Sequence, residues 1–151
     1  MSNYNEKSVL KTVSFAGMDF SGRDFSGSEL QNIDFTGANL TGANFKNANI
    51  TNCDFEKADI SSADFSGAII KNCGICNAVA IEANFTSANL NNTALVSTNC
   101  RAAKFVTAIM INCPAYATNF SNANVERAEY DHLSMTAKLL NDAKRVPGTR
   151  Y

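Results

Sequence analysis

A large apolar residue recurs at every fifth position along most of this chain. In the stretch 34–65 these residues are Phe35, Leu40, Phe45, Ile50, Phe55, Ile60 and Phe65. A period of five does not suit an α-helix, in which five residues advance the chain by about 500°. Nor does it suit a straight strand, whose side chains alternate between two faces. The chain must therefore turn a corner in every repeat.

Each five-residue unit divides into three extended residues and two corner residues. In the extended part the first and third side chains point inward and the second points outward. The inward pair is small and then large, and the outward residue is usually Asp or Asn. The second corner position is mostly Gly or Asn, which tolerate the positive φ of a type II turn. Where that position holds Lys57, Glu82, Ala102 or Thr107, we expect another turn type.

This register holds without a slip from Phe15 to Tyr130, which makes 24 units, and all ten Phe residues take the large inward position. The units ADISS, ANLTG, ANFKN and ANLNN follow the pattern A(D/N)LXX and resemble the pentapeptide repeat family. The resemblance covers residues 13–130 and implies an all-β fold, a right-handed parallel quadrilateral β-helix with four units per coil and about six coils. At ~4.8 Å between stacked strands, the rod would be about 29 Å long.

Four-sided coils would place residues that are 20 apart in stacked columns. One column then predicts an aromatic core ladder of Phe25, Phe45, Phe65, Phe85 and Phe105. Each buried Phe should contribute roughly 1.5–3 kcal/mol. The small inward residues on the same face are Ala, except for Arg23 in the first coil, where its guanidinium can still reach water.

The two ends depart from the repeat. Residues 1–12 are expected to form a cap segment over the first coil, because an open solenoid end exposes unpaired strand groups. Residues 131–151 are expected to hold a C-terminal α-helical cap, since Ser134–Arg145 favours a helix that ends before Pro147 and Gly148. In several members of the family a C-terminal helix also mediates dimers, so the resemblance leaves a homodimer open.

No constellation for catalysis, a cofactor or a metal is visible in the chain. His132 is the only histidine, and a filled solenoid offers no concave site for acid–base chemistry. Cys53, Cys73 and Cys113 share one small inward column, interrupted by Thr93, and lack zinc-site spacing. We interpret them as buried filler. Stacking at ~4.8 Å would also allow a disulfide between Cys53 and Cys73, although a cytosol does not favour it.

The chain has five cysteines, an odd number, which indicates free thiols and a reducing compartment. Cys76 differs from the inward cysteines because it falls at a corner and points outward. No apolar run approaches the ~20 residues of a membrane span, and the polar N-terminus does not read as a signal peptide. We therefore expect a cytoplasmic protein that contacts no membrane.

The outward acids raise the possibility of DNA mimicry, because some pentapeptide repeat proteins resemble duplex DNA and bind DNA gyrase. The acids are Asp19, Asp24, Glu29, Asp34, Asp54, Asp59 and Asp64, with Glu56 at a corner. Duplex DNA would carry about 17 charges along such a rod, whereas the net charge of this chain is −1. A gyrase or topoisomerase modulator that mimics DNA is therefore the alternative interpretation.

The outward pattern changes after Phe65, where apolar residues replace many of the Asp and Asn residues. A candidate protein-binding patch comprises Ile69, Cys76, Val96, Ile109, Ile111 and Tyr116. Exposed apolar patches usually mark interfaces. Val79, Ile81 and Val106 would lie on other faces, so drift of a degenerate repeat remains the other explanation. The leading hypothesis is a non-enzymatic protein-binding or scaffold module that makes no direct contact with nucleic acid. Its partner would be another protein or a second copy of the chain, bound through the patch or the C-terminal helix.

Overall fold

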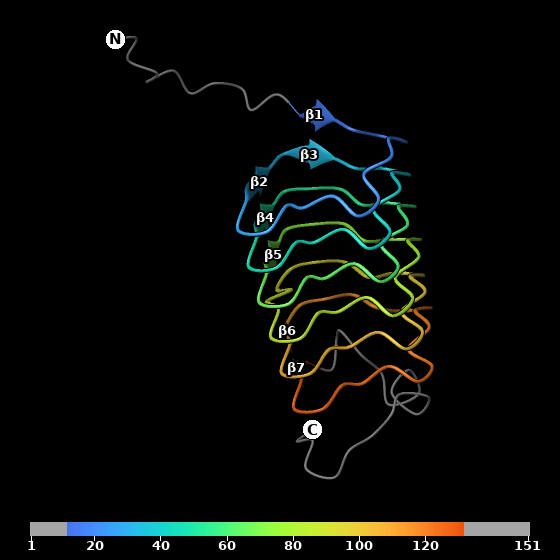
Figure 1. The fold of residues 1–151 in the computed structure, drawn as a ribbon. Coiled ribbons are helices and arrows are strands. Elements are labelled where there is room, and N and C mark those ends of the chain that lie inside the picture. Colours follow the sequence, from blue (N-terminus) through green and yellow to red (C-terminus); the bar gives the residue numbers. More distant parts are fainter. Residues whose placement is uncertain (1–11, 132–151) are drawn as a thin grey trace, which may run out of the picture.

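The computed structural model describes residues 12–131, and this part of the chain is a stack of four-sided β coils (Figure 1). Between residues 12 and 131 there is no helix, and hence none that could cross a membrane. The strands are short because each side of a coil is only three residues long. They are β1 (Val13–Ser14), β2 (Glu29–Gln31), β3 (Ile33–Asp34), β4 (Asn49–Thr51), β5 (Ile69–Lys71), β6 (Ile109–Met110) and β7 (Glu129–Tyr130).

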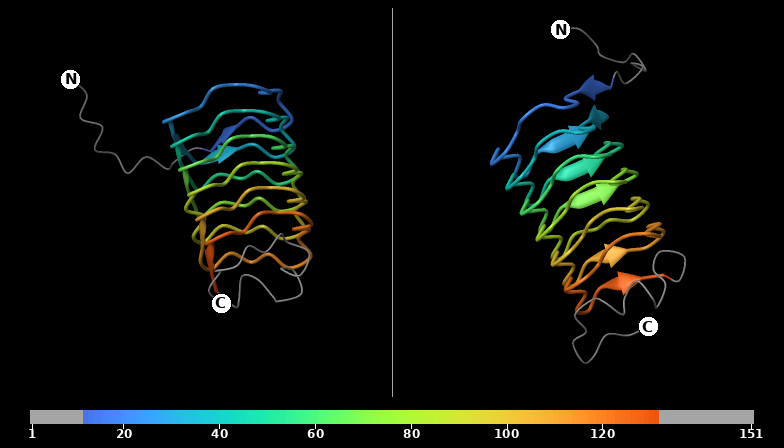
Figure 2. Two further views of the ribbon diagram at one scale, coloured as in Figure 1. Left: turned by 60° about the horizontal axis from the view of Figure 1, so that its bottom comes forward. Right: turned by 90° about the vertical axis from the view of Figure 1, so that its right-hand side faces the viewer.

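All strand pairing is parallel and joins residues 20 positions apart. Leu30 of β2 pairs with Ile50 of β4, and Ile50 pairs with Ile70 of β5. Isolated bridges keep the same offset from Asp19–Asn39 to Lys104–Asn124. Four units therefore make one coil, and the stacked coils form a rod (Figure 2).

The four faces of the rod can be numbered in chain order. Face 1 holds β1, β3 and the units around residues 55, 75, 95 and 115, and face 4 holds β2, β4, β5, β6 and β7. Faces 2 and 3 lie between them. Coils are numbered from the N-terminal end, so that coil 1 holds Phe15 and coil 6 holds Tyr130.

The corners share one backbone conformation, in which the second corner residue has positive φ. This includes Lys57, Glu82, Ala102 and Thr107, with φ of 58°, 59°, 57° and 55°. The expectation of another turn type at these positions was therefore wrong. The neighbouring coil imposes the conformation, since Lys57 N donates to Cys76 O at 3.0 Å and Glu82 N to Arg101 O at 3.0 Å. A left-handed non-Gly residue costs about 1–3 kcal/mol, so it persists only where such contacts over-determine it.

The core is a filled bore of alternating small and large side chains. On face 3 the rings of Phe45 and Phe65 lie 4.6 Å apart and nearly parallel, and Phe65–Phe85 and Phe85–Phe105 follow at 5.0 and 4.9 Å. Phe25 stacks on Phe45 at 4.9 Å but is only partly buried. Burial is thus lower in coil 1 than in the coils that follow, and Arg23 in coil 1 is exposed.

Several predictions fall on parts of the chain outside the described residues. These are the N-terminal cap segment up to residue 11, the C-terminal helix Ser134–Arg145, and His132. The described part supports an all-β solenoid and contains no helical cap.

Candidate functional site

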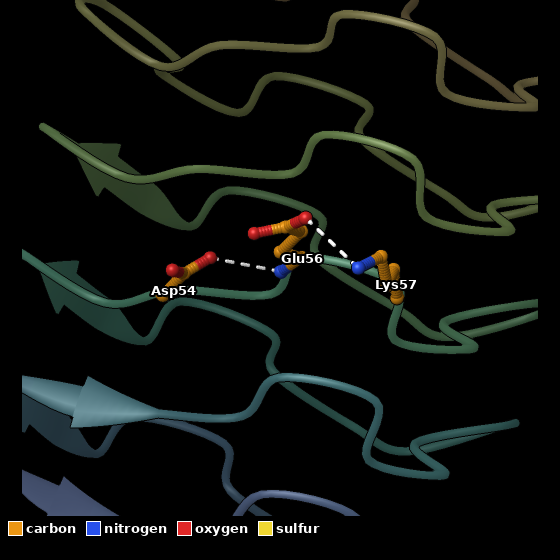
Figure 3. A network of polar contacts seen from close by, with 3 residues as sticks. All are labelled: Asp54, Glu56 and Lys57. Atoms are coloured by element: carbon orange, nitrogen blue, oxygen red, sulfur yellow. Dashed lines mark hydrogen bonds and ion pairs between the residues drawn. The ribbon is translucent and has the colours of Figure 1, made fainter.

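The outward Asp and Asn side chains cap the corners. Asp54 Oδ1 accepts a hydrogen bond from the N–H of Glu56 at 2.8 Å, while Lys57 pairs with the Glu56 carboxylate at 3.4 Å on the surface (Figure 3). The bond from an outward oxygen to the N–H two residues later recurs at Asp19, Asp24, Asp34, Asn39, Asn44, Asp59, Asp64, Asn84, Asn89, Asn99, Asn119 and Asn124. This is the local bond by which Asx residues favour turns. The acids therefore occupy these positions because they cap the backbone N–H groups of the corners.

Capping also changes the acidity of these carboxyl groups. Hydrogen bonds from the side chain and backbone of Thr36, and then from the Ser14 hydroxyl, lower the pKa of Asp34. Hydrogen bonds from the backbone and then the hydroxyl of Ser21 lower the pKa of Asp19, and Ser26 does the same for Asp24. In each case the bonds favour the ionised form.

The pKa of Asp34 predicts a loss of stability in acid. Because its folded pKa lies below the unfolded value, its stabilising contribution is present above about pH 4 and is lost as the pH falls through the folded pKa. In Asp34→Asn the amide oxygen can still cap Thr36 but does not titrate. We expect urea unfolding of Asp34→Asn to lose less stability between pH 7 and pH 3 than that of the unchanged protein. Equal losses in the two proteins would contradict this role of Asp34.

Three consecutive corners between faces 1 and 2 lack such a cap. The outward residues there are Gly74, Ala94 and Pro114, which carry no side-chain acceptor. No acceptor for the backbone N–H groups of Cys76, Val96 and Tyr116 is found among the described residues. Single uncapped corners also occur at Ile81 and Val106, on other edges of the rod.

We call these six residues the corner strip: Gly74, Cys76, Ala94, Val96, Pro114 and Tyr116. Its three corners are stacked, since Asn77 N donates to Val96 O at 2.9 Å and Ser97 N donates to Tyr116 O at 3.1 Å. Tyr116 is 68% exposed, more than any other large apolar residue between 12 and 131, and Cys76 and Val96 are half-buried. The strip carries no charge. Its three stacked corners form the longest run of uncapped apolar corners along any edge of the described rod.

The other residues of the predicted patch lie elsewhere. Ile111 is 39% exposed at the opposite edge of face 1, and its N–H donates to Asn91 Oδ1 at 3.0 Å. Ile69 and Ile109 are on face 4, and Asn89 separates them in the ladder. The six predicted residues therefore divide between three regions, and the stacked set is Cys76, Val96 and Tyr116.

The inward cysteines do more than fill space. Cys53 N donates to Cys73 Sγ at 3.4 Å, and the Cys73 thiol has Lys71 O at 3.2 Å and Ile50 O at 3.6 Å as acceptors. Farther along this column, Thr93 Oγ1 donates to Ile70 O at 2.9 Å. Small donors therefore satisfy carbonyl groups of the preceding coil, a role that the interpretation as apolar filler missed. The available signal was that Cys and Thr alone occupy this column from residue 53 to residue 113.

The five cysteines are free thiols, and burial separates them into two kinds. Desolvation raises the pKa of Cys100 to about 12 and that of Cys113 to about 11, so both stay protonated at neutral pH. Cys76 is half-buried at its corner. Between residues 12 and 131, no three His, Cys, Asp or Glu side chains gather as metal ligands.

Comparisons with solved structures show likeness to other solenoids. QnrB1, described as a plasmid-mediated fluoroquinolone resistance protein, is 26% identical, with a TM-score of 0.55 over 83% of this chain and 63% of the QnrB1 chain. The chain thus spans less than two thirds of QnrB1. A pentapeptide repeat protein from Nostoc PCC 7120 is 21% identical, with a TM-score of 0.51 over 80% of this chain and 99% of its own, which shows the fold alone.

No curated protein matches the sequence significantly. The sequence model of the pentapeptide repeat region matches residues 8–85, which is more than half of the chain. This match agrees with the five-residue units and the 20-residue ladder. The chain therefore belongs to the pentapeptide repeat family.

Proposed function

We propose that this chain is a non-enzymatic protein-binding module and that the corner strip is its contact surface. The observation that carries the proposal is the loss of three caps in succession along one edge, at corners that also bear apolar side chains. A capping hydrogen bond contributes about 0.5–1.5 kcal/mol. The corner strip lacks three of these hydrogen bonds on one edge. We therefore infer that the apolar side chains at these corners serve to contact a partner.

Tyr116 is the centre of the proposed contact. Its side chain is the most exposed large apolar group among the described residues, and Tyr is enriched at the energetic centres of protein interfaces. Pro114, two residues earlier, keeps the adjacent backbone stiff and without an N–H. A partner that covers Tyr116 would therefore bury apolar area without ordering a flexible segment.

Tyr116→Glu tests this proposal. We expect affinity capture from the native host to lose at least one specific partner, or self-association to fall at least tenfold, because a carboxylate would be buried in an apolar contact. The fold should persist, as Tyr116 does not pack in the core. Val106→Glu is the matched control, since Val106 is an uncapped apolar corner on another edge. An unchanged partner set and an unchanged oligomeric state in Tyr116→Glu would refute the proposal.

The second candidate function is a DNA-mimicking modulator of gyrase or topoisomerase. The likeness to QnrB1 favours it. Residues 13–72 carry eight acidic and four basic side chains, a net charge of −4. Duplex DNA would present about 8 charges over the same three coils. The acids are spread over all four faces, so a partner that approaches from one side meets few of them.

A gyrase supercoiling assay with and without a fluoroquinolone separates the two candidates. A gyrase modulator would either inhibit supercoiling or protect it from the fluoroquinolone. Asp→Asn changes at the outward acids would weaken this effect, although the amide oxygens would still cap the corners. A module that acts through the corner strip would leave supercoiling unchanged.

A further inference from the structure

We propose that the partner of the corner strip is a second copy of this chain, packed side by side with antiparallel axes about a two-fold axis beside Val96. The inference names a partner for the proposed binding surface and rests on that proposed function. The contact would be isologous, in that the same edge of each copy faces the other.

The side chains along the strip increase in size from one coil to the next. Cys76 is small, Val96 is intermediate and Tyr116 is large, at successive steps of ~4.8 Å along the rod. In an antiparallel pair, Cys76 would face the partner's Tyr116, and Val96 would face the partner's Val96. The combined size of the facing side chains then stays even along the contact. A parallel pair would set Tyr116 against its own copy and leave a gap at Cys76.

The surroundings of the strip permit this approach. Gly74, Ala94 and Pro114 project little beside the three corners, and none carries charge. Along this edge of the rod the nearest charged corner is Glu56 and Lys57, two coils before Val96, while Glu82 and Arg101 lie on the next edge. In the antiparallel pair Glu56 and Lys57 would lie one coil beyond the partner's Tyr116, outside the three facing pairs, which carry no charge.

A second solenoid also matches the strip in spacing. Both copies repeat every ~4.8 Å, so three side-chain contacts can form in register. An extended peptide laid along the rod would instead present same-side groups every ~6.6 Å and would lose register after one coil. The contact offers only three facing pairs of side chains, far fewer than the roughly 20–30 residues a side of a standard interface. We therefore expect a weak dimer whose population depends on concentration.

Cross-linking at the proposed axis tests the inference. In a Cys76→Ser background the four remaining thiols are buried, so Val96→Cys would supply the one accessible thiol of the described part. With oxidised glutathione as oxidant, two such thiols would form one intermolecular disulfide while the glutathione disulfide is reduced to two thiols. We expect covalent dimer to form at least tenfold faster for Val96→Cys than for the matched control Val106→Cys. Equal rates in the two variants would overturn the inference.

The direction of packing has its own readout. In the unchanged protein Cys76 is the one cysteine that is not buried, and it would face the partner's Tyr116 in the antiparallel pair but the partner's Cys76 in a parallel pair. We expect oxidised glutathione to give covalent dimer no faster in the unchanged protein than in Cys76→Ser. Faster formation of covalent dimer through Cys76 would show a parallel pair and would overturn the proposed arrangement.

Light scattering on the protein without added cysteines separates this inference from the function on which it rests. A dimer that forms as concentration rises, and is lost in Tyr116→Glu but retained in Val106→Glu, supports a second copy as the partner. A monomer at all concentrations that still loses a captured protein in Tyr116→Glu overturns the inference and leaves the binding function standing. If the protein is a monomer at all concentrations and Tyr116→Glu loses no captured protein, both the inference and the proposed binding function are contradicted.

Discussion

Replacing Phe65 with Ala is expected to lower the free energy of unfolding by about 3–5 kcal/mol. The Phe65 ring is 1% exposed, stacks between Phe45 and Phe85 at 4.6 and 5.0 Å, and meets Phe55 edge-on at 6.2 Å. Its backbone is held by the ladder, with Phe65 N donating to Asn84 O at 2.7 Å. The coils therefore cannot collapse into the cavity that Ala would leave, and urea unfolding followed by circular dichroism measures the loss.

Phe25→Ala is the matched control for this ladder position. Phe25 belongs to the same ladder, but it lies in coil 1, where it is only partly buried. Because folding removes less apolar surface from water there, we expect Phe25→Ala to lose less than half as much stability as Phe65→Ala. Equal losses would show that the depth of burial along the rod does not set the energetics of the ladder.

Replacing Thr93 with Val is expected to destabilise the rod by about 1–3 kcal/mol, although the two side chains have nearly the same shape. Thr93 is 0% exposed, and its hydroxyl donates to Ile70 O at 2.9 Å. Without the hydroxyl that carbonyl stays buried with no donor. The change thus isolates the hydrogen bond from the packing, and the same urea titration measures it.

Thr93→Ser keeps the hydroxyl and removes only a methyl group. We expect it to retain the hydrogen bond and to lose about 1 kcal/mol or less. If Thr93→Val proves as stable as the unchanged protein, the column of small donors is filler after all, as the sequence alone suggested.

Much of the fold could be predicted from the sequence, because the repeat is local and the same in every unit. Large inward residues five apart require a corner in each unit, and side chains 20 apart then stack, as Phe45, Phe65 and Phe85 do. The stacking of Cys76, Val96 and Tyr116 along one edge follows from the same register.

Features that depend on contacts between coils could not be predicted in this way. The positive φ of Lys57 and Glu82 contradicts their residue preferences, and it is imposed by backbone bonds to the next coil. The donor role of Thr93 likewise needs the position of a carbonyl 23 residues away.

The candidate site likewise has features that the sequence shows and features that only the structure shows. Its apolar residues are visible in the sequence, where Gly74, Ala94 and Pro114 replace the usual Asp or Asn. By itself the sequence determined the five-residue register, the inward ladder and the columns, since these depend only on which way successive side chains point. Only the tertiary structure decided that outward Asp and Asn cap the corners, that the corner strip lacks those caps, and that Tyr116 is the most exposed large apolar side chain of the described residues. Hydrogen bonds and exposure are set by neighbours that the coils bring together, and a sequence pattern does not contain them.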